Sequence, residues 1–309
     1  MKISNINIPV KVVAKQVDTT ALKNDDFLVR DPFILLYGDK YYMYLKKDGK
    51  LCAMVSDDLL SWSEPLQIFN PPTDFYGVDN FFWAPECHYY KGKFYIFTSC
   101  FSKQTNKRRI STYVADNPLG PFVENSIGGI TAEEYDAIDG TLYVDDDSVP
   151  YMVYVHEWTS MPDKIGSFEY AQLSEDFTHF VSAPKHMFYA SVLTKTSGVT
   201  DGCYLLKLDS KKLCMLWSTF LPDERGENAY VMAIASSSNG RLDGEWSQDK
   251  ILYQKNMRSE YVHDAGHGMI FKDKNGELNL TCHSPNGPYQ VAEKLTFFKV
   301  TETVDGIEI

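Results

Sequence analysis

The segment 28–45, LVRDPFILLYGDKYYMYL, decides the expected fold. After a short lead-in it presents the carboxylate of Asp31 and then the apolar run Phe33–Tyr37. A polar turn at Gly38–Lys40 separates this run from the aromatic run Tyr41–Leu45. Two apolar runs joined by a short turn of this composition are typical of a β-hairpin. We therefore expect a hairpin with a carboxylate at the start of its first strand.

The same pattern returns four times along the chain. Each copy has a leading polar residue, an apolar strand, a polar turn and a second apolar strand. The leading residues are Asp31, Glu86, Asp139, Asp201 and His267. Consecutive leading residues lie 55, 53, 62 and 66 positions apart, and a recurrence of this kind indicates a repeat architecture.

A second type of segment follows each of the first four hairpins. A strand runs into a turn that contains Ser or Ala with an Asp, Asn or Glu, and a Trp or Phe comes next, at 53–63, 112–122, 169–180 and 233–247. Each unit therefore has four strands, and four-stranded sheets repeated around an axis form a β-propeller. We expect an all-β fold of five antiparallel four-stranded blades, approximately at 28–70, 81–125, 137–185, 199–250 and 264–309.

The two ends of the chain are expected to close the ring. The fifth unit ends with Val291–Val300 and lacks the second recurrent segment. We expect the N-terminal strand Ile8–Val13 to join this last blade. No linker divides the chain, so residues 1–309 are expected to form a single domain. One helical turn is expected, at Thr131–Ala137.

The composition narrows the classes of partner. Hydrophobic residues make up 44% of the 309 residues and aromatic residues 14%, which favours a strand-rich globular protein with a large core. A net charge of −12 argues against nucleic acid and anionic membranes as partners and suits a neutral substrate. The six cysteines have no metal-ligand spacing and are expected to be free, buried thiols.

The sequence leaves the location of the protein open. Its N-terminus lacks the apolar segment of a signal peptide, and no run approaches the roughly 18 apolar residues of a membrane span. A cytoplasmic protein and a secreted protein that has lost its leader both agree with this.

The architecture predicts where the polar residues meet. The first strand of each blade lines the central channel, so the five leading residues are expected to converge at one mouth. Several carboxylates in a small channel raise one another's pKa, and a purely structural protein has no use for that arrangement. The second strand of each hairpin returns antiparallel, so its end lies beside the leading residue. The residues expected there are Ser99, His156, Glu157, Trp158, Trp217, Ser218, His283 and Ser284.

For Trp83 and two charged runs, a purely structural role must be considered as well. Trp83 suits a sugar-stacking platform and a place in the core about equally. The run Asp145–Asp147 lies at a hairpin turn, at the far end of the strands from the leading residues, and is expected to be a solvated turn. The basic run Lys107–Arg109 is expected in a loop, as a solvated face.

At this point the chain resembles glycoside hydrolase family 43, whose members are five-bladed propellers. The matching motifs are Arg30-Asp31-Pro32, Trp83-Ala84-Pro85-Glu86, Ile138-Asp139-Gly140 with Asp145-Asp146-Asp147, and Gly266-His267-Gly268-Met269. The resemblance implies inverting hydrolysis of arabinose-, xylose- or galactose-containing glycans. It implies that Asp31 is the general base and that Asp139 tunes the pKa of the general acid. It also implies that His267 lies near a bound calcium ion in the channel.

The general acid departs from the family pattern. The family usually has Glu followed by Gly-Pro, whereas this chain has Asp201-Gly202-Cys203. An aspartate is shorter by one carbon–carbon bond, about 1.5 Å, so Asp201 must be carried further in to reach the leaving group. Inverting hydrolysis needs two carboxyl groups about 6.5–9.5 Å apart, one ionised and one protonated. Asp31 and Asp201 suit these roles, because like-charge repulsion from Asp139 would raise the pKa of Asp201.

Three hypotheses follow from these residues. The first is an inverting glycosidase with the catalytic residues Asp31, Asp139 and Asp201. Its expected substrate-binding residues are Trp83, Glu86, His156, Trp158, Ser218 and His267. It requires no cofactor, although a structural Ca²⁺ held by His267 would suit the channel. The second is a carbohydrate-binding propeller that has lost the acid, and the third is a glycoside phosphorylase or a protein-interaction propeller.

Overall fold

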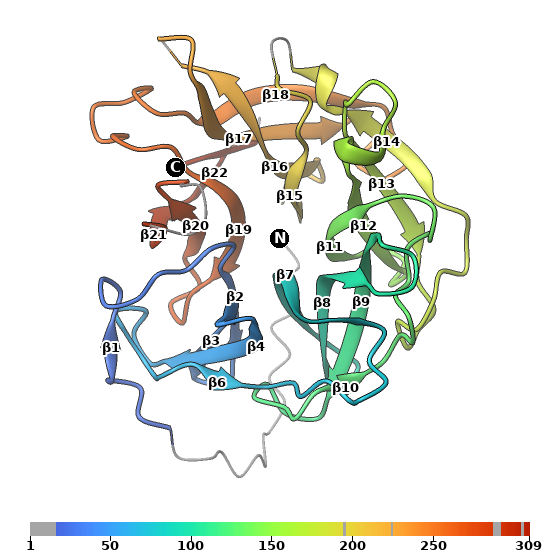
Figure 1. The fold of residues 1–309 in the computed structure, drawn as a ribbon. Helices are drawn as coiled ribbons and strands as arrows, with labels where there is room; N and C mark the ends of the chain where they lie inside the picture. The colour runs from blue at the N-terminus through green and yellow to red at the C-terminus, as the bar shows by residue number, and fades with distance from the viewer. Residues whose placement is uncertain (1–16, 194–195, 224, 287–291, 304–305) are drawn as a thin grey trace.

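Five antiparallel sheets surround a central axis in the computed structural model, which describes residues 17–193, 196–223, 225–286, 292–303 and 306–309. The innermost strand of each sheet borders the centre of the ring (Figure 1), and these strands are β2 (Phe33–Tyr37), β7 (Gly77–Tyr90), β11 (Ala137–Val144), β15 (Asp201–Lys207) and β19 (Gly266–Lys272). The structure thus confirms the all-β, five-bladed propeller expected from the repeat.

The outer strands follow in chain order within each blade. In the first three blades they are β3 (Lys40–Lys47), β4 (Lys50–Ser56) and β6 (Leu66–Gln67), then β8 (Lys93–Ser102), β9 (Arg108–Ala115) and β10 (Val123–Glu124), then β12 (Pro150–His156), β13 (Ser167–Gln172) and β14 (Lys185–Tyr189). In the last two blades they are β16 (Leu213–Pro222), β17 (Asn228–Ser237) and β18 (Trp246–Tyr253), then β20 (Leu278–Ser284) and β21 (Lys294–Lys299).

Short elements flank the blades. Strand β1 (Leu22–Lys23) pairs with β5 (Ser61–Trp62) beside the first blade, and β22 (Thr301–Thr303) pairs with β23 (Gly306–Glu308). The described part of the chain contains two single-turn 3₁₀ helices, η1 (Trp158–Ser160) and η2 (Ala190–Val192). No helix in the described part of the chain is long and apolar enough to cross a membrane.

Two local predictions concern the helical turn and the strand that closes the ring. The segment Thr131–Ala137 forms bends and leads into β11, so the helical turn expected there was wrong. The expected closing strand Ile8–Val13 lies outside the described residues. Within the described residues the fifth sheet has three strands, and the first and last blades meet where the Val29 N–H donates to the Glu293 carbonyl at 3.0 Å.

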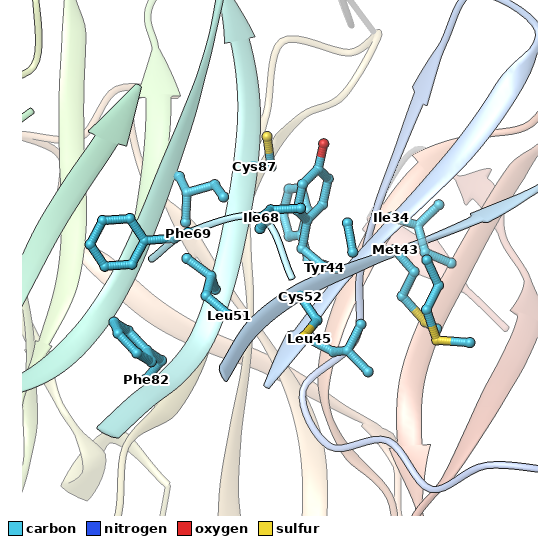
Figure 2. Packing of buried hydrophobic residues seen from close by; sticks show 14 of the residues in the cluster. Ile34, Met43, Tyr44, Leu45, Leu51, Cys52, Ile68, Phe69, Phe82 and Cys87 are labelled. Carbon is cyan, nitrogen blue, oxygen red and sulfur yellow. The ribbon is translucent and has the colours of Figure 1, made fainter. Parts of the chain in front are cut away.

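The core consists of apolar layers between neighbouring sheets. Between the first two blades, Tyr44, Leu51, Phe69, Phe82 and Cys87 pack together, all at most 2% exposed (Figure 2). The Tyr44 hydroxyl donates to the Pro118 carbonyl at 2.9 Å, which satisfies its buried polar end. All six cysteines are buried and free, as expected. These layers fix the radial position of the inner strands, which carry the polar residues of the channel.

Candidate active site

Each inner strand has a backbone irregularity at the mouth of the channel. The pairing of β7, β11, β15 and β19 with the next strand shifts at this point, as in a β-bulge. The first bulged residue has a positive φ in each case, as does Asp31 just before β2: Asp31 51°, Ala84 43°, Asp139 54°, Gly202 57° and His267 55°. A backbone in this region is costly for residues other than glycine and is concentrated at functional sites.

These five positions are the structurally equivalent ones, which corrects two of the equivalences expected from the sequence. The position equivalent to Asp31 is Ala84 in the second blade and Gly202 in the fourth. Glu86 therefore lies two residues beyond the bulge start, and Asp201 lies one residue before it. A Cβ at Gly202 would lie 2.9 Å from Cγ of His267, so glycine at this position leaves room for the imidazole ring.

Asp31 lies between two histidines. Its Oδ1 is 3.2 Å from Nδ1 of His267 and 3.2 Å from Nδ1 of His283. Its N–H donates to His283 Nδ1 at 3.3 Å, and His283 Nε2 lies 2.9 Å from Asn286 Oδ1. Burial alone would raise the pKa of Asp31, but His267, His283 and the nearby Arg30 outweigh it and hold the pKa well below its usual range. Asp31 is therefore a stable carboxylate at neutral pH.

Asp139 is buried at the same mouth, with 6% exposure. Its Oδ2 accepts the Gly202 N–H at 3.0 Å and lies 3.9 Å from Nδ1 of His267. Burial, followed by repulsion from Asp31 and Glu86, raises the pKa of Asp139, although His267 and the Gly202 N–H act in the opposite direction. Asp139 thus places a carboxyl group directly beside the backbone of the fourth blade's bulge.

Asp201 is held by a tyrosine. The hydroxyl of Tyr230, on β17, donates to Asp201 Oδ2 at 3.1 Å. Burial and repulsion from Asp139 and Asp31 raise the pKa of Asp201 well above its usual value, and the Tyr230 hydrogen bond and Arg30 oppose this only in part. Asp201 is therefore a neutral carboxylic acid under conditions in which Asp31 is ionised.

The ends of the second strands lie beside the bulges, as the hairpin geometry predicts. Oγ of Ser99 accepts the Asp139 N–H at 3.0 Å, and Oγ of Ser218 accepts the His267 N–H at 2.8 Å. In the same way, His283 accepts the Asp31 N–H. Each of these three side chains belongs to the blade that precedes the bulge it binds. Ser218 has 0% exposure, so it serves as a backbone partner of His267 within the protein.

The partly exposed rim contains the aromatic residues of blades two and three. Trp83 stacks on Phe81 with ring centroids 4.5 Å apart, and the Arg108 guanidinium lies 5.6 Å from the Trp83 ring. His156 stacks on Tyr135 at 3.8 Å, and its Nδ1 is 3.0 Å from Glu169. Trp158 lies in η1 and is half-buried. Trp83 packs against the core and remains partly exposed, so its core role is confirmed and its role as a sugar-stacking platform stays a prediction.

The basic run was misplaced by sequence reasoning. Arg108 and Arg109 lie in strand β9, where a solvated loop was expected. Arg108 forms ion pairs with Glu157 and Asp136, and Arg109 is 8% exposed and donates to the Thr131 carbonyl. A glycoside phosphorylase would need basic groups to bind phosphate, whereas the guanidinium groups of Arg108 and Arg109 are occupied by the protein itself.

The channel cavity beside His267 is small. Within the described residues, no group of three or more His, Cys, Asp or Glu side chains is placed to hold a metal ion. The channel cavity bounded by Asp31, Glu86, Gly202 and His267 has a volume of about 10 Å³, room for roughly one water. Glu86 Oε2 is instead 3.0 Å from His88 Nε2. A Ca²⁺ ion takes six to eight oxygen ligands, which can include water, so a calcium ion near His267 stays a prediction.

Sequence reasoning missed the residues that surround Asp31 and Asp201 from other elements. Tyr230 lies in the middle of an apolar strand, and Glu293 lies just before β21. Glu293 is fully buried, and its Oε1 accepts a hydrogen bond from Arg30 at 2.8 Å. Gly266 is an indirect sequence sign of Tyr230, because a Cβ at position 266 would lie 2.0 Å from the tyrosine ring. This signal becomes readable only when both blades are placed in space.

Comparison with known proteins identifies the family. The family model "Glycosyl hydrolases family 43" matches residues 26–307. An endo-arabinase structure from Bacteroides thetaiotaomicron VPI-5482 superimposes with a TM-score of 0.82 and 30% identity, covering 93% of this chain and 99% of that one. A Bacillus subtilis protein named extracellular endo-alpha-(1->5)-L-arabinanase 1 is 23% identical over 198 residues, which are 60% of this chain and 61% of that protein.

A further relative has a similar name. The Cellvibrio japonicus protein named extracellular exo-alpha-(1->5)-L-arabinofuranosidase ArbA is 27% identical over 178 residues, 53% of this chain and 46% of that protein. The matches thus span only about half to three-fifths of these two curated relatives. The family model, by contrast, spans all five blades, including every channel residue described above. The chain therefore belongs to family 43 of the glycosyl hydrolases.

Proposed function

We propose that the protein is an inverting glycoside hydrolase in which Asp31 activates water and Asp201 protonates the leaving group. The observation that carries this proposal is the opposite displacement of two pKa values at one channel mouth. The pKa of Asp31 is held well below its usual range, and the pKa of Asp201 is raised well above it. Two carboxyl groups whose environments separate their pKa values in this way are suited to base and acid roles at one pH.

The proposed reaction has a single displacement. The Asp31 carboxylate takes a proton from a water molecule, whose oxygen attacks the anomeric carbon. The glycosidic bond breaks on the opposite face, and its oxygen takes the proton of Asp201. Asp139 contributes to the repulsion that keeps Asp201 protonated before the reaction. The products leave with inverted anomeric configuration, Asp31 protonated and Asp201 ionised.

Tyr230 is proposed to position the shortened acid. Its hydroxyl holds one oxygen of Asp201 and leaves the other free to carry the proton. The Tyr230 ring stacks near His283 at 5.7 Å and packs on Phe220 at 4.8 Å, so both sides of the ring are supported. A fixed carboxyl orientation matters because displacement of a reacting group by about 1 Å can cost roughly 10²-fold in rate.

The proposed substrates are arabinose-containing glycans first, followed by xylose- and galactose-containing ones. The support for this order is that the relatives described above are named arabinanases or an arabinofuranosidase. Trp83, His156 and Trp158 are proposed as sugar-contacting residues of the rim. Ser218 is proposed as a positioning residue, because it is fully buried against the backbone of His267.

No metal takes part in the proposed steps. Because no group of three or more His, Cys, Asp or Glu side chains within the described residues is placed to hold a metal ion, we expect activity to survive exhaustive treatment with EDTA. Loss of activity on EDTA treatment, with recovery on addition of Ca²⁺ alone, would show that a metal is required.

The central experiment compares two substrates of the same sugar. Asp201→Asn should lose about 10²–10⁴-fold in kcat/KM on arabinan, whose leaving oxygen needs a proton. The same variant should lose much less on a 2,4-dinitrophenyl arabinofuranoside, whose leaving group departs without protonation. Equal losses on both substrates would remove Asp201 from the acid role. Proton NMR of the first product anomer checks inversion, and a retained configuration would contradict the single displacement.

A carbohydrate-binding propeller is the second candidate, because Asp201 replaces the usual glutamate. Wild-type protein that turns over no glycan in a panel of arabinans, xylans and galactans, but binds one of them, would favour this candidate.

A further inference from the structure

A second polar hollow lies between blades three and four, at the end of the strands opposite the candidate active site. It is lined by Tyr143, Tyr151, Tyr170, Gln172, Ser182 and Lys185 of blade three, together with Asp145 and Asp146 of the hairpin turn and with Lys207 and residues 240–243 of blade four. We call this set the rear groove. Its cavity volume is about 140 Å³, below the roughly 300–1,000 Å³ of sites that enclose a whole small molecule, so it suits a short part of a longer ligand.

The rear groove is separate from the channel mouth. On β11, Asp139 is at the mouth and Tyr143 is in the groove, four residues further on. On β15, Asp201 is at the mouth and Lys207 is in the groove, six residues further on. At about 3.3 Å per residue these intervals correspond to roughly 13 and 20 Å.

The blade-three wall presents hydroxyl and amide groups in a row. Tyr143 pairs with Tyr151 across β11 and β12, and Tyr151 pairs with Gln172 across β12 and β13. The rings of Tyr151 and Tyr170 meet edge to face at 6.0 Å. Among the described residues, the hydroxyls of these three tyrosines and the side-chain amide of Gln172 have no hydrogen-bond partner. The wall therefore offers a set of unused donors and acceptors beside the partly exposed ring of Tyr151, whereas Tyr143 and Tyr170 are only 8% and 6% exposed.

The charges of the rear groove balance. Three acidic residues, Asp145, Asp146 and Asp243, are matched by Lys185, Lys207 and Arg241. Nζ of Lys207 lies 3.3 Å from Asp146, and Nε of Arg241 lies 3.7 Å from Asp243. Burial, followed by Asp146 and Asp145, raises the pKa of Tyr143 to about 12, so its hydroxyl stays a donor at neutral pH. An anion would meet three carboxylates here and a cation three basic groups, so an uncharged ligand fits best.

We infer that the rear groove is a non-catalytic binding site for one or two units of a neutral glycan chain. Sugars carry many hydroxyls and apolar ring faces, and they match unpartnered phenol and amide groups beside aromatic rings. The choice of glycan, but not the site itself, rests on the proposed function. A chain bound in the rear groove would raise the local concentration of polysaccharide around the enzyme, with little consequence for small substrates.

The test counts the binding sites. In an Asp31→Asn background that prevents turnover, titration calorimetry with a linear arabino-oligosaccharide should find two molecules bound per chain. Adding Tyr151→Ala and Gln172→Ala should leave one. Xylo- and galacto-oligosaccharides are titrated in the same way. Tyr189→Ala is the matched control, because Tyr189 is an exposed tyrosine of the same blade outside the groove. A single site both in Asp31→Asn and in the groove variant, for every sugar, overturns the inference.

Activity gives a second measurement that separates this inference from the proposed function. With Asp31 intact, Tyr151→Phe and Gln172→Ala together should lower kcat/KM on soluble arabinan roughly three- to tenfold, the effect of one or two lost hydrogen bonds. The value on an aryl arabinofuranoside should not change. An unchanged value on both substrates counts against the groove while the hydrolase stands. If no wild-type turnover is found but the second site is lost as expected, the groove stands and the hydrolase proposal fails.

Discussion

The first strand of blade three has aspartates at both ends, in contrasting environments. Asp139, at the channel mouth, has a side-chain exposure of 7%, whereas Asp147, in the turn after the strand, has 72%. Asp139 is close to two further carboxyl groups, Asp31 and Asp201, which perturb one another's pKa. In the turn, Asp145 accepts the N–H groups of Asp147 and Val149, as an ordinary turn residue does.

The difference shows that burial and neighbours, and not residue type, make a carboxyl group chemically useful. Water screens the turn aspartates, and surface ion pairs such as Arg241–Asp147 contribute little. At the mouth, low dielectric strengthens every charge interaction. The two histidines then favour the ionised form of Asp31, while repulsion and burial favour the neutral form of Asp201. Four variants, each with a partner, test this contrast.

The largest difference is expected between two variants, each of which removes one carboxylate, at opposite ends of the strands. Asp31→Asn should lower kcat on an aryl arabinofuranoside by about 10²–10⁴-fold, because it removes the proposed general base. Asp147→Asn, in the exposed turn, should change kcat less than twofold. Steady-state kinetics of the two purified variants measures both. Comparable losses in the two variants would show that the contrast between the two ends has no catalytic meaning.

Two variants at the mouth should shift the pH profile in opposite directions. Asp139→Asn removes repulsion, so the pKa of Asp201 falls and the alkaline limb of the kcat profile moves to lower pH. Tyr230→Phe removes a hydrogen bond that favours the ionised form, so that limb moves to higher pH. Both should lower kcat roughly 10- to 100-fold. Limbs that move together, or do not move, would contradict the assignment of the raised pKa to Asp201.

Two glycines, one at each end of the strands, allow a comparison in which the backbone strain of an alanine substitution is the same. Gly202 and Gly38 have φ values of +57° and +63°. Alanine at either position is strained by about 1–2 kcal/mol. A Cβ at Gly202 meets His267 at 2.9 Å, whereas a Cβ at Gly38, in a hairpin turn, meets nothing within 4 Å. Gly202→Ala should therefore also lower kcat about tenfold, and Gly38→Ala should leave it intact. Equal kcat in the two variants would show that the His267 position is unimportant.

The smallest expected effect is a gain in stability. Because the folded-state pKa of Asp201 is raised, its contribution to stability is complete below the unfolded-state pKa and is lost as pH rises through the folded value. Asp201→Asn should therefore be more stable than wild type at neutral pH by about 1–2 kcal/mol, or roughly 2–4 °C in Tm. The gain should vanish near pH 4. Asp147→Asn is the control, and both variants are measured by calorimetry at several pH values. A gain in stability that does not depend on pH would contradict this origin.

Much of the fold was predictable because the repeat is local. Each hairpin is specified by an apolar run, a polar turn and a second run, and five copies at similar spacing define five blades. The same reasoning placed Ser99, Ser218 and His283 beside the inner strands, because an antiparallel return fixes which ends meet. Asp31, Asp139 and His267 were identified at equivalent positions, and the backbone conformations agree.

The errors arose where the repeat is irregular. A bulge adds residues to one strand only, and the sequence does not show where the added residues lie. Glu86 and Asp201 are therefore expected to be equivalent to Asp31, although they lie two residues after and one residue before the equivalent position. Arg108 and Arg109 have ordinary surface composition, but the carboxylates that bind them come from distant segments. The sequence of Thr131–Ala137 does not show which parts of the protein it contacts. In the structure it forms bends that lead into β11, and not a helical turn.

The sequence by itself determined the number of blades and the acidic residues that lead two of them, because apolar periodicity and turn chemistry act over a few residues. Only the tertiary structure decided which aspartate is ionised and which is protonated. That outcome depends on the two histidines beside Asp31, which come from another blade, and on the removal of water from both aspartates. It also depends on Tyr230 beside Asp201, which lies two strands away in the same blade. Electrostatic energy depends on distance and burial in space, which spacing along a chain does not record.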